Sequence, residues 1–142
     1  MKKSVLVTIA LSASLFAGLG AASVQADASA WHKGTPSFLV GHKYRTSIKH
    51  GYHGMPTYQY LTSTKNSIDY IYSQADGYGG SHTGYKRSDH VYTVRYRAID
   101  WYGTHKYHTY KISRLSATRI KVGKTHLVKF SKYPTWHGKT VR

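Results

Sequence analysis

The sequence predicts an all-β fold that follows an N-terminal signal-peptide helix. We expect an antiparallel meander of about seven strands, forming a small up-and-down (lipocalin-like) barrel or a half-open barrel. Apolar and aromatic residues alternate with Lys, Arg, Thr and Ser through residues 90–133, as in a sheet with one solvated face. Turn residues separate these runs at short intervals, and no useful helical period occurs after residue 30. A two-sheet sandwich would need crossed connections, for which only residues 76–89 are long enough.

Residues 1–26 have the pattern of a signal peptide. Lys2 and Lys3 precede an apolar, uncharged run over residues 5–22, and small residues stand at Val24 and Ala26. We expect cleavage after Ala26, with a cut after Ala30 as the alternative. Glycines interrupt the apolar run, which leads straight to the cleavage pattern, so no transmembrane anchor is expected after processing. The prediction is a secreted, extracellular protein.

The remaining chain is predicted to hold an exposed lead-in (27–36), a single β-domain (37–134) and a basic tail (135–142). Lys65 and Asn66 form a plausible two-residue turn between two of the strands. In the strand after that turn, Ile68, Tyr70 and Tyr72 share one face. The expected strands are residues 44–49, 57–64, 67–74, 92–99, 106–115, 119–122 and 126–133.

Residues 76–89 break the alternation and contain four glycines. This length is unusual for a connection in a small domain, so we predict either a functional loop or a mobile one. The strand after it has the clearest alternation in the chain, with Tyr92, Val94 and Tyr96 facing inward and Arg95 and Arg97 outward. In the last strand, Val128 and Phe130 are expected to face inward.

Charge is the most unusual bulk property. The formal net charge is +16 with the ten histidines neutral, and the only acidic residues are five aspartates. The histidines would add positive charge as the pH falls to 5. A basic domain of this kind adsorbs to polyanions, unless the charge serves solubility alone. There is no cysteine, so neither disulfides nor a lipid-modified cysteine can form.

Five basic residues are predicted to form a binding face for polyanions, because they fall on outward strand positions or close to them. They are Arg95, Arg97, Lys111, Lys121 and Lys129. Three tyrosines placed in loops are expected to add stacking contacts: Tyr78, Tyr85 and Tyr102. Trp31 either caps the barrel or is a free aromatic group.

Enzymatic and metal-binding chemistry are not predicted. The aspartate contexts do not indicate the carboxylate pair of a glycosidase, and cysteine-dependent catalysis is excluded. Ser81 and His82 are adjacent but lie outside any nucleophile motif. Two His-x-x-His spacings lack the further ligands of a zinc site, so we expect no metal and no cofactor.

Several runs resemble small secreted, basic proteins of lactic acid bacteria. One is the run 31–36 followed by Leu39, Gly41, Tyr44 and Arg45; the others are 110–115, 120–122 and 130–133. This resemblance covers most of the mature chain and implies a compartment rather than an activity. The run 41–44 is similar to the first strand of lipocalin-type barrels but lacks their Trp, so it implies a barrel without implying the ligand cavity.

These observations lead to a hypothesis of function. We expect a non-enzymatic, secreted protein that is retained electrostatically on the cell wall by an anionic envelope polymer, either teichoic acid or acidic polysaccharide. The alternatives are a small-ligand-binding barrel, a cationic protein acting on nucleic acid without sequence specificity or on membranes, and a protein inhibitor. The sequence leaves the oligomeric state open.

Overall fold

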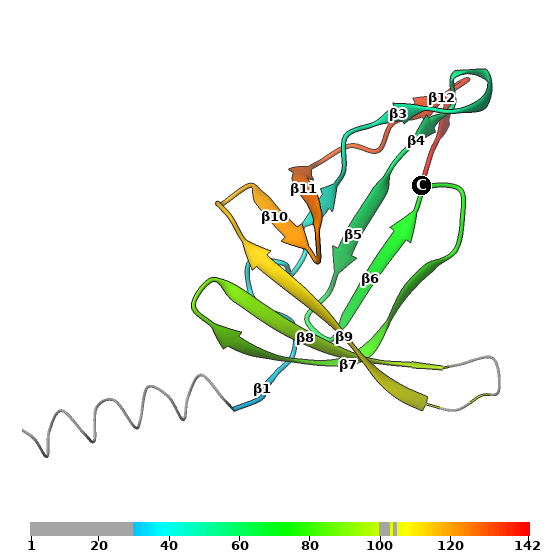
Figure 1. Cartoon of the computed structure of the whole chain (residues 1–142). Coiled ribbons are helices and arrows are strands. Elements are labelled where there is room, and N and C mark those ends of the chain that lie inside the picture. Colours follow the sequence, from blue (N-terminus) through cyan, green and yellow to red (C-terminus); the bar gives the residue numbers. More distant parts are fainter. Residues whose placement is uncertain (1–29, 100–102, 104) are drawn as a thin grey trace, which may run out of the picture. The chain divides into compact units, whose positions relative to one another are not determined.

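Strand pairing closes the chain into an antiparallel barrel. The computed structural model describes residues 30–99, 103 and 105–142, so the predicted signal peptide lies outside the described residues. Eight strands form the barrel (Figure 1), in the order β2, β5, β6, β7, β8, β9, β10 and β11. Their bounds are β2 (Lys43–Arg45), β5 (Gln59–Ser63), β6 (Ser67–Tyr72), β7 (Gly77–Ser88), β8 (Val91–Ile99), β9 (His105–Arg114), β10 (Arg119–Val122) and β11 (Thr125–Phe130).

The predicted fold class is confirmed, and the barrel is closed rather than half-open. Each of these strands pairs with the next along the chain, and β11 pairs back onto β2 with Lys129 opposite Tyr44. Short strands outside this ring are β1 (His32–Lys33), β3 (Lys49–His50), β4 (Pro56–Thr57), β12 (Thr135–Trp136) and β13 (Lys139–Thr140). A 3-10 turn, η1, spans Tyr52–Gly54. No helix among the described residues is both long and apolar enough to span a membrane.

The strand β7 was not predicted from the sequence. Residues 76–89 were predicted to be a loop, and this is wrong: Gly77–Ser88 forms a twelve-residue strand. Its first part pairs with β6 and its second part with β8 and β1. A Cβ on Gly79 would lie 2.4 Å from the Ile68 carbonyl oxygen, and one on Gly80 would lie 2.1 Å from that of Arg97. These glycines therefore allow the close approach of neighbouring backbone rather than marking a loop.

The barrel interior is filled by side chains from alternating strand positions. Ile68 and Val94 are fully buried, and Tyr92 and Tyr96 are nearly so, as predicted. Three buried tyrosines place their hydroxyls on acceptors: that of Tyr44 donates to the Phe38 carbonyl at 2.9 Å, that of Tyr58 to the Val141 carbonyl, and that of Tyr70 to the Gln59 side-chain oxygen. Much of the large tyrosine content therefore serves the core.

The predicted phase of β11 is wrong. Leu127 is 1 % exposed and belongs to the interior cluster, whereas Val128 is 49 % exposed. Residues 127 and 128 are both apolar, so a period of two could start on either one. Phe130 is two residues from Val128 in the same strand, so it also lies on the outer surface and not in the interior as predicted.

A second apolar cluster forms on the outer surface of β5, beneath the C-terminal segment. The buried Tyr60 alternates with the interior residue Leu61 and therefore points outward. It packs with Tyr58 and Val141, and the Tyr58 hydroxyl donates to the Val141 carbonyl. The segment predicted as a basic tail thus forms the β12–β13 hairpin and supplies Val141 to this cluster.

The segment before β2 also packs against the barrel. His32 pairs with Tyr85 and Lys33 with Gly84 in the β1–β7 ladder. Thr35 is buried, and its hydroxyl lies 2.9 Å from that of Thr83. Residues 34–36 are buried and therefore differ from the exposed lead-in expected from the sequence, whereas Trp31 and Lys33 are exposed. The β1–β7 pairing holds Trp31 beside β7 and β8, where the candidate site lies.

Candidate functional site

A groove of about 670 Å³ lies on the outer surface of the barrel, where β1, β7, β8 and β9 are neighbours. Arg95 belongs to its lining and alternates with the fully buried Val94, so its side chain leaves the barrel interior. The aromatic and cationic lining residues are Trp31, His32, Lys33, His82, Arg95 and Tyr107. The groove is therefore both aromatic and basic.

Arg95 is the central residue of this groove. Its guanidinium carbon lies 4.3 Å from the centre of the Trp31 ring and 5.3 Å from that of the Tyr107 ring. Both distances are within the range of cation–π attraction. Trp31 precedes β1, on the far side of β7, whereas Tyr107 comes from β9 on the opposite side of β8. The two rings thus reach the same cation on the outer surface from segments on either side of β8.

Gly84 makes room for the Arg95 side chain. The two residues are directly paired across β7 and β8, so a side chain at position 84 would point to the same face. A Cβ there would lie 3.1 Å from the Arg95 Nε and 3.1 Å from the His32 carbonyl oxygen. That Nε is buried and has no hydrogen-bond partner among the described residues. The arginine therefore lies across β7 in the space that the glycine leaves.

A β-bulge shapes the rim of the groove. The register between β7 and β8 shifts from Ser81 opposite Arg97 to Gly84 opposite Arg95, which gives β7 one extra residue. His82 lies in this bulge with a φ of 54°, a conformation that is uncommon outside glycine. Its Nδ1 lies 2.8 Å from the Ser81 Oγ. Such bulges redirect a side chain, and this one puts His82 in the groove lining.

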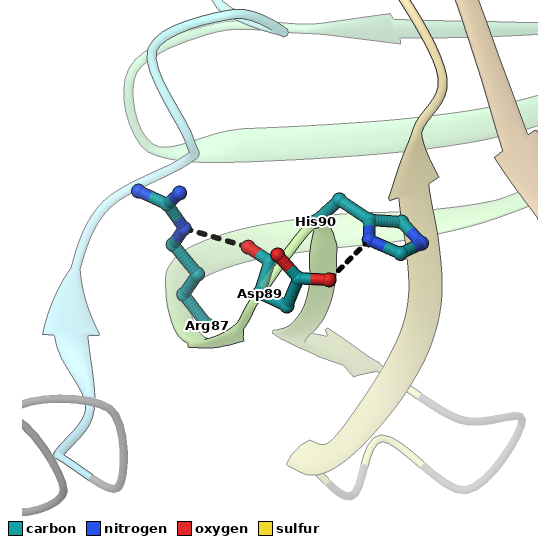
Figure 2. A network of polar contacts seen from close by, with 3 residues as sticks. All are labelled: Arg87, Asp89 and His90. Atoms are coloured by element: carbon teal, nitrogen blue, oxygen red, sulfur yellow. Dashed lines mark hydrogen bonds and ion pairs between the residues drawn. The ribbon is translucent and has the colours of Figure 1, made fainter.

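The groove is electrostatically positive. Lys86 adds a cation 5.1 Å from the centre of the Trp31 ring. None of the aspartates in the described part of the chain lines the groove. Asp89, in the β7–β8 turn, instead pairs with His90 at 2.6 Å, and its carbonyl accepts a hydrogen bond from the Arg87 Nε (Figure 2). Arg95 and Lys33 make no ion pair with any described carboxylate, so their charge is available to an external anion.

Four of the five predicted basic residues share the outer surface of neighbouring strands. Arg95 and Arg97 alternate with buried residues of β8, and Lys111 and Lys121 do so in β9 and β10. Lys129 differs from these four. It pairs with the interior residue Tyr44, so its side chain is directed to the inner face of the sheet, at a position that is exposed. Of the five, only Arg95 lines the groove.

The three predicted loop aromatics have different surroundings. Tyr78 is exposed in β7, away from the groove lining, and its carbonyl accepts a hydrogen bond from the Tyr110 hydroxyl. Tyr85 is half-buried in β7, where its ring packs against Tyr92 and stacks on His32. Tyr102 lies outside the described residues.

The groove aromatics Trp31 and Tyr107 were not among the predicted binding residues. Tyr107 shares its outward phase with Lys111, so the period-two pattern of that strand could have identified it. Trp31 is next to His32 and Lys33 in the sequence. This combination of an aromatic ring with basic residues could have indicated a binding residue. The distance of Trp31 from Arg95 in the sequence concealed their contact.

The described residues do not assemble the ligands of a metal site, and Ser81 and His82 form the only serine–histidine side-chain hydrogen bond among them. The Ser81–His82 contact is a hydrogen bond between neighbours, and no described side chain orients the Nε2 of His82. No group of three or more potential ligands among His, Cys, Asp and Glu is gathered in residues 30–99, 103 and 105–142. The groove itself presents cations and aromatic rings.

Comparison of the chain with protein-family models, curated proteins and solved structures found no match in any of the three. A functional assignment therefore has to rest on the geometry of the barrel and of this groove.

Proposed function

We propose that this is a secreted, non-enzymatic protein held at the cell surface by an anionic wall polymer or acidic polysaccharide. The observation that carries the proposal is the Arg95 guanidinium, which is flanked by Trp31 and Tyr107 in a groove whose described lining residues include no carboxylate. Arg97, Lys111 and Lys121 extend the basic surface over β8, β9 and β10. A linear polyanion lying across these strands would meet several cations in succession.

The charge of the whole chain supports the same conclusion. The full sequence has a formal charge of +16, and removal of Lys2 and Lys3 with the predicted signal peptide would leave +14. Such a charge attracts polyanions at long range, whereas local contacts decide where the polymer lies. Exposed cations act through solvent, so their attraction is screened by salt. The Debye length falls from about 8 Å at ~0.15 M salt to about 3 Å at ~1 M. Binding of this kind should therefore be strongly sensitive to salt.

The test measures retention of the purified mature protein on purified cell walls as salt is raised from ~0.15 to ~1 M. We expect retention to collapse over this range. A double variant, Arg95→Gln with Arg97→Gln, should weaken retention by about fivefold or more. The matched control, Lys129→Gln with Lys132→Gln, removes the same charge elsewhere and should have a smaller effect. Retention that does not change with salt concentration would overturn the proposal. Equal losses of retention in the two double variants would overturn the assignment of the binding surface to Arg95 and Arg97.

Two further measurements separate related functions. Fractionation of a culture into medium, salt wash and wall should place the protein in the last two fractions. Tighter binding to a DNA duplex than to walls, in a gel-shift competition at equal salt, would instead favour a nucleic-acid-binding protein. Dye leakage from anionic vesicles would favour a membrane-active one.

Small-ligand binding is the second candidate function. A pocket of about 470 Å³ lies at the end of the barrel where β5 begins and β6 ends, and it is lined by Gln59, Tyr72 and Thr125 among others. The Gln59 side-chain oxygen accepts a hydrogen bond from Tyr70, which leaves its amide nitrogen for a ligand. Native mass spectrometry of the protein from its secreting cells would test this, because a retained small molecule would appear as a discrete mass increment.

A further inference from the structure

We propose that the groove around Arg95 selects acidic sugars, meaning polymers whose carboxylate is attached to a pyranose ring, over ringless phosphate polymers. This inference rests on the proposed function and names the class of polymer that the site takes. The groove combines an arginine whose side chain has restricted freedom, two partly exposed aromatic rings beside it, and polar side chains around them.

The arginine is placed for a planar anion. Its Nε is buried above Gly84, and its guanidinium contacts the rings of Trp31 and Tyr107. The terminal N–H groups of a guanidinium lie in its plane, and a ring stacked on its face would leave them for hydrogen bonds. These terminal donors match the two oxygens of a carboxylate in a bidentate pair. A lysine at this position would offer only a point charge.

The two aromatic rings favour a ligand with a ring of its own. The Trp31 residue is 37 % exposed and Tyr107 is 58 % exposed, so each presents apolar surface next to the cation. One face of a pyranose ring carries C–H groups that lose contact with water when they pack on an aromatic ring. A polymer of glycerol phosphate or inorganic phosphate has no such face and gains only from charge.

The remaining lining suits a ligand rich in hydroxyl groups. Asn66, Ser81 and Thr83 also line the groove, and Ser81 and Asn66 are exposed. Amide and hydroxyl side chains both donate and accept hydrogen bonds, as sugar hydroxyls require. The volume of about 670 Å³ lies within the range of small-ligand sites. The groove therefore fits a short oligosaccharide stretch rather than a single ion.

The test compares two probes by isothermal titration at fixed ionic strength and pH 7: trigalacturonate and inorganic tripolyphosphate. Tripolyphosphate carries more negative charge, so charge alone predicts that it binds more tightly. We expect trigalacturonate to bind about tenfold more tightly instead. Equal affinities, or tighter binding of tripolyphosphate, would overturn the inference. Tighter binding of a single-stranded DNA oligonucleotide than of trigalacturonate would overturn it as well.

Three variants localise the effect. Tyr107→Ala should weaken trigalacturonate about fivefold or more and leave tripolyphosphate within about twofold. Arg95→Lys keeps the charge and should also weaken trigalacturonate selectively, because the fork of donors is lost. The control is Tyr52→Ala, which removes an exposed tyrosine outside the groove and should change neither affinity. Parallel losses for both probes in Tyr107→Ala would overturn the role of the ring.

The failure of this inference is distinguishable from that of the proposed function. Salt-sensitive wall retention without a preference for trigalacturonate would refute the sugar selectivity alone. If the protein is not retained on walls and binds neither probe, the proposed function fails too.

Discussion

Replacing Gly80 by alanine should destabilise the barrel, because β7 passes too close to β8 to admit a side chain. The added Cβ would lie 2.1 Å from the Arg97 carbonyl oxygen, 2.8 Å from its carbonyl carbon and 3.2 Å from the Ala98 Cα. The strands would have to move apart by roughly 1 Å, in a ladder where both are paired. Overpacking of this size costs about 1–3 kcal/mol of unfolding free energy. That is a large share of the ~5–15 kcal/mol that stabilises an ordinary domain.

Urea denaturation followed by tyrosine and tryptophan fluorescence measures this cost. At a slope of about 1–3 kcal/mol per molar, the midpoint should fall by about 1 M. Ser88→Ala is the control, because Ser88 is an exposed residue of the same strand and its replacement should change stability by less than about 0.5 kcal/mol. A midpoint for Gly80→Ala equal to that of the unmodified protein would refute the close approach of the two strands.

Three further predictions concern pH and the C-terminal segment. Burial raises the pKa of Asp69, so the ionised carboxylate opposes folding at neutral pH. Asp69→Asn should therefore raise the unfolding free energy at pH 7 and lose this advantage near pH ~3, where the carboxyl is protonated in both states; lower stability at pH 7 in urea denaturation would contradict this. Tyr58→Phe removes the hydroxyl that donates to Val141 and should cost about 1 kcal/mol in the same assay, whereas no loss would mean that ring packing alone holds the segment. Lowering the pH from 7 to 5 should strengthen wall retention, because a sequence with ten histidines gains positive charge as the pH falls; weaker retention at pH 5 would count against it.

The strands with strict alternation were predictable from the sequence. In β8, Tyr92, Val94 and Tyr96 alternate with polar residues, so only one choice of inner face buries them. The same pattern put Arg95 and Arg97 outside, and Arg95 is the one of the two that lines the groove. In β11 the adjacent Leu127 and Val128 allow both phases, and the choice is made by pairing with β2 and β10.

The β7 strand shows what local patterns miss. Glycine lowers strand propensity, so a run with Gly77, Gly79 and Gly80 resembles a loop when it is considered alone. In the barrel these positions lie against the backbone of β6 and β8, where only glycine fits. The reason for the glycines is therefore found in strands that are distant in the sequence.

The all-β class, the antiparallel meander and the outward direction of Arg95 could be predicted from the amino-acid pattern, because they follow from the period of two and from short connections. Closure of the barrel, the strand at β7 and the facing of Lys129 became evident in the folded protein. The tertiary structure also decided the groove, whose parts come from Trp31, Gly84, Arg95 and Tyr107. The physical reason is that alternation specifies the facing of a side chain within its own strand. Which side chains meet is set by the register between strands, and that depends on the whole barrel.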